Sequence, residues 1–205
     1  MNFLAHFHLS PPWPDALAGA YLGDFVRGPV EQHQDLPLMI RQGISLHRAI
    51  DAFTDAHPVW RQSCHHLHPS RRRLGGIVID VIYDHYLCRN WNRFATIPLE
   101  EFAATCYESL LSRTTWMEEA ARRGVRRMKS QSWLSAYGET EGIALALRRM
   151  ERRSPALAGL ASAMEDFTTH YDELEVEFLD FYPKLIDFSA EVWAGLQTKG
   201  PTGIG

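Results

Sequence analysis

The sequence predicts an all-α protein, a single-domain helical bundle, from three observations. Apolar residues recur at spacings of three and four along most of the chain, which is the helical period. Prolines, glycines and capping residues flank these stretches as helix start and stop signals. No stretch keeps the alternation typical of a half-buried strand, and no repeat or Ser/Gly linker divides the 205 residues. We therefore expect one domain over residues 1–196 and a disordered tail over residues 197–205.

The first half of the chain contains four predicted helices. A short one ends at a run of prolines, and the next runs from Pro14 and Asp15 to a Gly-Pro stop. The third is long and amphipathic, and the fourth is so apolar that its length is what favours a buried helix over a strand. The four are expected before Pro11, over residues 15–28, over residues 36–57 and over residues 75–94.

The second half begins with a clear helix start, because Pro98 is followed by two glutamates. From there to Trp193 the apolar spacing stays helical, and residues that disfavour helix interiors interrupt it. The expected breaks lie near Arg113, Ser130, Gly138, Ser154-Pro155 and Pro183.

Composition restricts the class of protein. A chain with 45% hydrophobic and 22% charged residues can bury one substantial core without disulfides or a structural metal. Its three cysteines are odd in number and far apart, so neither a disulfide framework nor a zinc knuckle is expected. With no basic leader and no membrane-length apolar run, the chain is expected to be soluble and cytoplasmic, with no membrane partner. The net charge of -4 argues against a nucleic-acid partner.

Ionisable residues recur inside the most apolar predicted helices, where an unpaired charge is costly. A spacing of four puts several of them on one helix face. They are His6 and His8 in the first helix, Asp24 in the second, His47, Asp51 and Asp55 in the third, and Asp80, Asp84 and His85 in the fourth. Four segments are therefore expected to converge on one pocket. Its imidazole and carboxylate groups suit manganese, iron or magnesium better than a zinc thiolate site.

A structural role competes with the functional one at each position. His6 or His8 could be hydrogen-bonded core residues, and Asp51 or Asp55 could pair with Arg48. The histidines between the third and fourth helices have no matching carboxylate and are interpreted as a surface loop: His57, His65, His66 and His68. The acidic stretch of Glu173, Glu175 and Glu177 is interpreted as a solvated helix face, which leaves little support for a di-iron bundle. Nine aromatic residues at helical spacing are assigned to the core: Trp91, Phe94, Trp116, Trp133, Phe167, Tyr171, Phe178, Phe181 and Tyr182.

The chain has no nucleophile elbow, Gly-rich phosphate loop or HExxH motif. Metal-activated water is the chemistry that remains. A divalent ion lowers the pKa of bound water toward ~7 and polarises a phosphoryl oxygen. Arg48 is expected to clamp a phosphate oxygen. Phosphoester hydrolysis is the natural reaction for such a site.

Five stretches in this order resemble the acyl carrier protein phosphodiesterase family: NFLAHFHL, GDFVRG, GISLHRAIDAFTD, IDVIYDHYL and HYDELE. The resemblance extends from Met1 to about Pro183. It implies an HD-domain-like, all-helical hydrolase that uses Mn²⁺, with Mg²⁺ or Fe²⁺ as alternatives. The implied substrate is a holo acyl carrier protein, cleaved between its serine and 4'-phosphopantetheine.

The resemblance carries site roles over to matching positions. The candidates are His6, Asp24, His47, Arg48, Asp51, Asp55, Asp80, Asp84 and His85. The pattern departs from ordinary HD hydrolases, because the adjacent pair is Asp84-His85, in reversed order. Our hypothesis places Asp24, His47, Asp84 and His85 nearest the ion, with His6 as a further ligand. Asp51 or Asp80 then lies behind these ligands or acts as the general base. The residues expected to be catalytic are Asp24, Arg48, Asp51 and Asp80.

Clustered basic residues suggest a docking face despite the acidic net charge. They are Arg71, Arg72, Arg73, Arg122, Arg123, Arg126, Arg127 and Lys129. An acidic carrier protein is the expected partner of such a face. Two other functions stay open on sequence alone: an HD-like phosphohydrolase of a small nucleotide or phosphoester, and a non-catalytic helical binding module. The sequence does not determine the oligomeric state.

Overall fold

The computed structural model describes residues 1–198, and within them every regular element is helical. The α-helices of this part of the chain are α1 (Phe3–His8), α2 (Pro14–Leu22), α3 (Leu38–Ala56), α4 (Pro58–His65), α5 (Gly75–Arg89), α6 (Trp91–Phe94), α7 (Leu99–Ser112), α8 (Glu119–Ser130), α9 (Trp133–Ala136), α10 (Thr140–Glu151), α11 (Ala163–Thr169) and α12 (Tyr171–Thr198). Short 3-10 turns connect some of them: η1 (Val30–Gln32), η2 (Pro69–Leu74), η3 (Thr114–Trp116) and η4 (Pro155–Leu157). The prediction of an all-α, single helical domain is confirmed.

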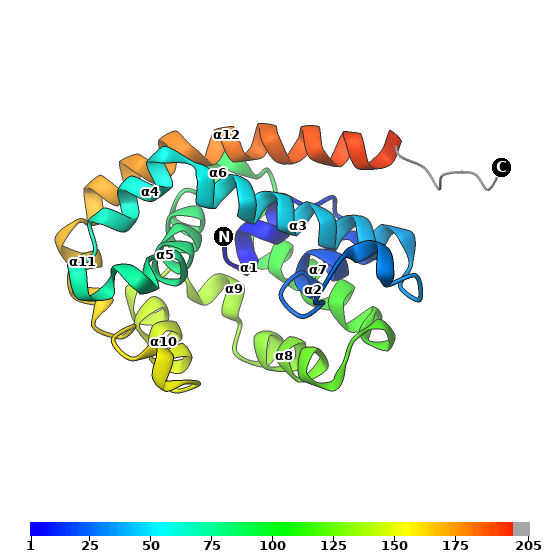
Figure 1. Cartoon of the computed structure of the whole chain (residues 1–205), viewed down its shortest axis with the longest axis horizontal. Coiled ribbons are helices and arrows are strands. Elements are labelled where there is room, and N and C mark those ends of the chain that lie inside the picture. Colours follow the sequence, from blue (N-terminus) through cyan, green and yellow to red (C-terminus); the bar gives the residue numbers. More distant parts are fainter. Residues whose placement is uncertain (199–205) are drawn as a thin grey trace.

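The helices surround the N-terminus, which lies near the centre of the molecule (Figure 1). The long helix α12 runs along one side, with α3 and α4 beside it, while α8 and α10 lie on the opposite side (Figure 1). Helix α5 passes through the interior and contacts α1, α4, α10 and α12. One continuous cluster of buried apolar residues joins all these elements. The first eight residues are therefore enclosed by segments distant in sequence.

Two predicted helices end earlier than expected. The second stops at Leu22, so Asp24 lies in the turn that follows α2. The fourth stops at Arg89, where Asn90 leaves helical geometry with φ -107° and ψ 19° and separates α5 from α6. Both helices are largely buried up to these residues, but burial alone does not extend a helix, because its end depends on local backbone geometry.

The predicted break at Pro183 is wrong, because α12 continues through it to Thr198. Proline removes one backbone donor from a helix interior, but this loss does not end α12 at Pro183. Pro183 is exposed. Residues 197 and 198 of the expected disordered tail thus belong to the helix, and residues 199–205 lie outside the described residues.

The aromatic prediction holds with one correction: Trp116 is 41% exposed, whereas the other eight residues are buried or half-buried. None of the described helices is both long enough and apolar enough to cross a bilayer.

Candidate active site

Close packing of α2 against α3 positions the first functional side chain, His47. A Cβ atom on Gly19 would lie 2.7 Å from the Cα of Gly43, and one on Gly43 would lie 2.5 Å from the carbonyl oxygen of Ala16. Only glycines allow the two backbones to approach this closely. One turn further along, a Cβ on Gly23 would lie 2.7 Å from Nδ1 of His47. Glycine therefore makes room for the imidazole between the two helices.

The His47 ring is fixed in one orientation. Its Nδ1 donates to the carbonyl oxygen of Ala20 at 2.7 Å, and the side chain is 2% exposed. Nε2 then lies 3.1 Å from Oδ2 of Asp51 and 3.6 Å from Oδ1 of Asp24. A backbone carbonyl on one ring nitrogen is the usual arrangement behind a histidine whose other nitrogen binds metal.

Helix α1 brings a second imidazole to the same point. The His6 and His47 rings stack with centroids 3.8 Å apart and an interplanar angle of 12°. Nε2 of His6 lies 3.1 Å from Oδ1 of Asp51 and 3.1 Å from the carbonyl oxygen of Met1. Within the described residues, His6, His47 and Asp51 form a group whose ligand atoms all lie within 4.8 Å of one another. Asp24 adds a second carboxylate beside His47.

Asp80 borders this group from α5. The Met1 amino group lies 3.2 Å from Oδ1 of Asp51 and 3.2 Å from Oδ2 of Asp80. The other Asp80 oxygen accepts from the Trp60 indole at 3.2 Å. The Met1 amino group thus lies between Asp80 and Asp51, the carboxylate that contacts both imidazoles.

The electrostatics keep the carboxylates of the cluster ionised. Burial acts to raise the pKa of Asp51, but hydrogen bonds from His47 and His6 hold it far below its usual range. Burial likewise acts to raise the pKa of Asp24, but the hydrogen bond and charge of His47 outweigh it and lower that pKa. Burial lowers the pKa of His47, but Asp24 and Asp51 outweigh it and raise that pKa to about 9. Burial and the neighbouring His47 lower the pKa of His6 to about 4.

The cluster fits a divalent cation by its donor set. Two imidazole nitrogens and the carboxylate oxygens suit a borderline or hard divalent metal. Within the described residues, Nδ1 of His6 is buried without a hydrogen-bond partner, so this nitrogen can carry the ring proton when Nε2 binds a metal. At the surface, the side chains of Asp24 and Asp51 are 53% and 40% exposed. A substrate can therefore reach the carboxylates from solvent.

Asp84 does not join the cluster. Its two carboxylate oxygens accept from the backbone N–H groups of Leu4 and Ala5, at 2.9 and 3.0 Å. These are free amides in the first turn of α1, where Asn2 makes no side-chain cap. Burial raises the pKa of Asp84 to about 7, although both backbone bonds act to lower it. Asp84 thus caps α1 from another helix, and its two oxygens face these amides.

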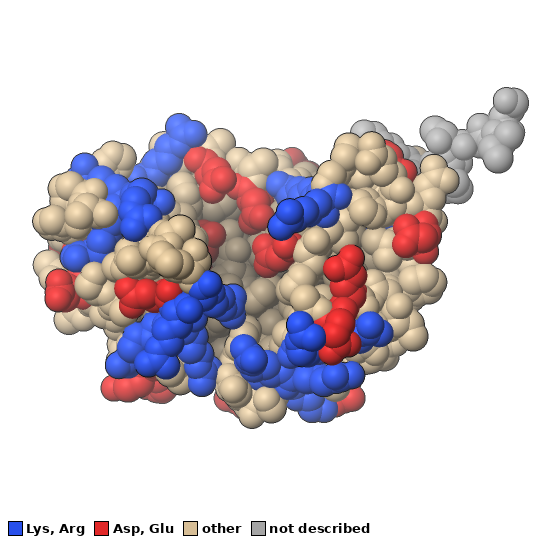
Figure 2. All heavy atoms as spheres, turned by 60° about the horizontal axis from the view of Figure 1, so that its bottom comes forward, with Lys and Arg blue, Asp and Glu red and all other residues tan. Residues whose placement is uncertain are grey.

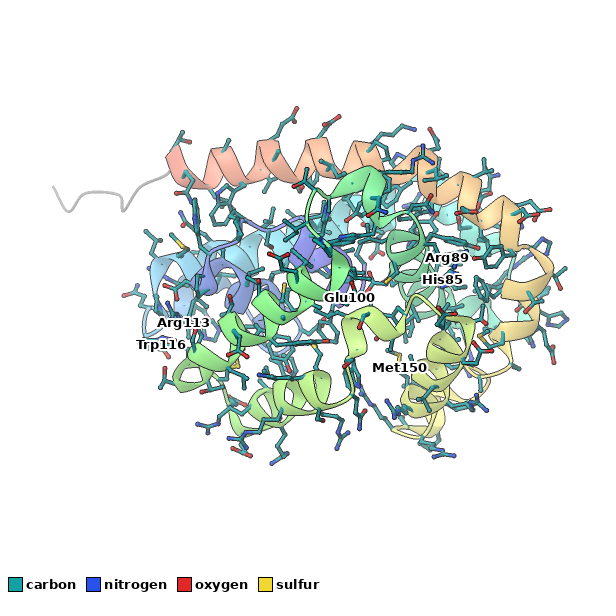
Figure 3. All side chains as sticks on the ribbon, turned by 180° about the vertical axis from the view of Figure 1, so that it is seen from behind. His85, Arg89, Glu100, Arg113, Trp116 and Met150 are labelled. Atoms are coloured by element: carbon teal, nitrogen blue, oxygen red, sulfur yellow. The ribbon has the colours of Figure 1, made fainter. Side chains whose placement is uncertain are left out.

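His85 also lies apart from the cluster. Its Nδ1 is 2.8 Å from the carbonyl oxygen of Tyr137, and its Nε2 is 2.8 Å from the hydroxyl of Tyr171. Viewed from behind, His85 and Arg89 lie together on α5 (Figure 3). Both nitrogens of His85 thus join α5 to other segments, which leaves neither for a metal.

The Arg48 side chain binds backbone carbonyl groups. Its two terminal nitrogens donate to the carbonyl oxygens of Gly28 and Val26, each at 2.7 Å. It therefore holds the segment after Asp24, in place of the phosphate clamp expected from sequence. Asp55, one turn beyond Asp51, is exposed and forms no ion pair within the described residues. Asp24, His6, His47 and Asp51 are the candidates that the fold brings together.

Some interpretations of the other histidines change. His8 behaves as a core residue, with hydrogen bonds to Tyr182 and to the Phe94 carbonyl. His66, expected in a surface loop without a carboxylate, lies 2.9 Å from Glu177. Glu177 is only 8% exposed, so it is not part of a solvated face, and it also accepts from the buried Ser63. This network joins α4 to α12.

The glycines behind His47 are the residues that sequence reasoning missed. Gly19 and Gly23 are four apart at the end of α2, and Gly43 and His47 are four apart on α3. Small residues at this spacing in two neighbouring segments indicate close backbone contact. That signal was present in the sequence.

Comparison with known proteins identifies the chain. A family model described as acyl carrier protein phosphodiesterase matches residues 1–185. The acyl carrier protein phosphodiesterase of Escherichia coli O6:H1 is 35% identical over 191 residues, which cover 91% of this chain and 96% of the relative. That of Enterobacter sp. strain 638 is 35% identical over 190 residues, with the same coverage. No solved structure matches the chain. The chain belongs to the acyl carrier protein phosphodiesterase family.

Proposed function

We propose that this enzyme is a metal-dependent phosphodiesterase that hydrolyses 4'-phosphopantetheine from the serine of a holo acyl carrier protein and releases the apo carrier. Two kinds of observation support the proposal. The relatives named above are called acyl carrier protein phosphodiesterases, and they match this chain over nearly the full length of both proteins. The cluster of His6, His47, Asp51 and Asp24 supplies the donor set that metal-assisted phosphoester hydrolysis needs.

In this proposal His6, His47, Asp51 and Asp24 hold Mn²⁺ or a related divalent ion. When bound, such an ion lowers the pKa of a water ligand and polarises a phosphoryl oxygen. The observation that carries this assignment is the convergence of both Nε2 atoms on the oxygens of Asp51. Asp84 and His85 are left out of the ligand set, because their polar atoms bond to other parts of the protein.

The remaining polar residues orient the site. Asp24 is the most exposed carboxylate of the cluster and is ionised, so one of its oxygens is placed to take a proton from an attacking water. Arg48 fixes the backbone of residues 26–28 and thereby the turn that carries Asp24. Asp80 balances the positive charge beside Asp51.

The direct test is the intact mass of the carrier protein. Purified enzyme is incubated with holo carrier, with Mn²⁺ and with a chelator. We expect conversion to the apo mass only with metal, and loss of conversion in Asp51→Asn. Asp55→Asn is the matched control, because it changes an exposed carboxylate one turn away on the same helix.

Three other outcomes are informative. Conversion in the chelator would contradict the metal requirement. An unchanged carrier mass with metal bound would redirect the search to small phosphoesters. An unchanged mass with no bound metal would contradict both the ligand set and the reaction.

A further inference from the structure

A basic cleft lies between α8, α9 and α10. Lysine and arginine side chains gather over α8 and α10 on the two sides of a hollow, with acidic side chains beyond it (Figure 2). One pocket in this cleft is walled by Arg127, Arg149, Arg152 and Arg153, together with Gln131 and Trp133. The α10 half of this surface was not among the basic clusters singled out from the sequence.

The arginines of this cleft are gathered in one place, and in the part of the chain that the structure describes they form no ion pairs. Within residues 1–198, none of five side chains forms an ion pair: Arg126, Arg127, Arg149, Arg152 and Arg153. Gathering like charges is unfavourable unless an anionic ligand neutralises them. In a chain of net charge -4, such a group indicates a binding surface for negative charge.

Several of the basic residues expected to dock a partner are engaged within the protein. Arg71 forms ion pairs with Asp166 and Glu165, and Arg73 donates to the carbonyl oxygens of Ala156 and Ala158. Near the start and end of α8 the same holds: Arg122 and Arg123 pair with Glu119, and Lys129 pairs with Glu108. The surface free to bind is therefore centred on Arg126 and Arg127 and continues onto α10.

The cleft adjoins the catalytic cluster. The Tyr21 hydroxyl donates to the Ala121 carbonyl at 2.9 Å, and a Cβ on Gly124 would overlap that hydroxyl, so α8 packs directly on the helix that leads to Asp24. Burial and the neighbouring Asp24 raise the pKa of the Tyr21 hydroxyl, and the positive charge of Arg153, on the other wall, acts to lower it. A ligand seated between α8 and α10 thus lies next to the segment that carries Asp24.

The cleft also has an apolar centre. A second pocket shares Trp133, Arg149 and Arg153 with the basic one. Its other walls include Met150 and Leu145, which is 44% exposed although it is a large apolar residue. An apolar centre within a charged rim is the usual anatomy of a protein interface.

We propose that the α8–α10 cleft docks an acidic helix of the carrier protein, whose carboxylates pair with the arginines while an apolar side chain enters beside Leu145. The inference rests on the proposed function, since the partner is its substrate. It names a recognition surface that does not take part in the chemistry. Docking here brings the carrier serine to the side of the protein on which Asp24 is exposed.

The test measures binding of fluorescently labelled apo carrier protein, which has no bond to hydrolyse. We expect Arg127→Glu/Arg149→Glu to raise the dissociation constant by about tenfold or more, because both charges become repulsive. The wild-type affinity should weaken as salt rises, and the variant should lose most of this dependence. With holo carrier, KM should rise while kcat changes little, since saturating substrate still fills the site.

The control is Arg61→Glu/Arg93→Glu, which makes the same change in net charge on exposed residues of α4 and α6, away from the cleft. It should bind like the wild-type protein. Equal weakening in both variants would mean that net charge alone steers the partner and would overturn the docking site, as would unchanged binding in the cleft variant. If wild-type enzyme binds apo carrier through the cleft but never converts holo carrier, the proposed reaction fails while the docking surface stands.

Discussion

Helices α3 and α5 carry similar patterns of histidine and aspartate, yet the fold uses them for different purposes. On α3, His47 and Asp51 face the imidazole of His6 and form a group able to bind metal. On α5, Asp84 caps α1 and His85 joins two distant segments, at Tyr137 and Tyr171. Carboxylates four apart in an apolar helix therefore indicate a buried polar role, and their partners decide which role it is.

The difference has a physical origin in the partners that each helix meets. Helix α3 packs on α2 through glycines, and the facing surface offers His47 one carbonyl and leaves Nε2 toward the carboxylates. Helix α5 meets the N-terminal end of α1, where free amides attract a carboxylate. Each site satisfies polar groups that would otherwise be buried without partners.

The largest expected effect is on the α3 side. Asp51→Asn should lower the rate of holo carrier hydrolysis by about a thousandfold or more and reduce bound manganese, because both imidazoles lose their shared charged partner. Rate and metal content are measured separately, by mass conversion and by metal analysis of the dialysed protein. An Asp51→Asn variant with full metal and full rate would remove α3 from the site.

The next effect concerns α5 and is one of stability. Asp84→Ala leaves two buried amides of α1 without an acceptor, which should lower the free energy of unfolding by about 2–4 kcal/mol. Urea denaturation of the metal-free protein measures it, with Asp55→Ala as the exposed control. Should Asp84→Ala lose its metal but keep its stability, the contrast between the helices would be reversed.

A third prediction concerns pH and the metal-free cluster. Since the pKa of His47 is raised to about 9, a proton competes with metal at Nε2 below that pH. Manganese affinity should therefore rise by up to about tenfold per pH unit from pH ~6.5 to pH ~9. His6, with its pKa lowered to about 4, adds no dependence in this range.

Calorimetry in buffers of different ionisation enthalpy checks this, because it counts about one proton released per ion bound near pH 7.5. Release of two protons would show that His6 is also protonated in the metal-free enzyme. A flat pH profile would remove His47 from the ligand set.

The smallest expected effect is at His85. His85→Phe should cost about 1–2 kcal/mol of stability, because the Tyr137 carbonyl and the Tyr171 hydroxyl lose a partner. Bound manganese should remain at the wild-type level, whereas His47→Phe should lose it. Metal loss in His85→Phe at preserved stability would restore the sequence-based assignment of His85.

Much of the fold could be predicted from sequence because its signals are local. Apolar spacing, prolines and glycines indicated helices throughout, and the ends of α3 and α10 agree with the Pro58 and Ser154-Pro155 signals within a few residues. Pro183 was misjudged because a proline usually breaks or kinks a helix, whereas tertiary packing of α12 keeps the helix continuous through it.

By itself, the sequence determined that the chain is helical, that His6, Asp24, His47 and Asp51 are unusual in apolar surroundings, and that its motifs resemble one hydrolase family. Only the tertiary structure decided which of these groups meet. In the folded protein Arg48 donates to backbone carbonyl groups, and Asp84 caps the first turn of α1. Glu177 pairs with His66, and arginines of α8 and α10 line one cleft. The reason is that a polar side chain takes its role from the nearest group able to satisfy it, and that group comes from segments far away in the chain.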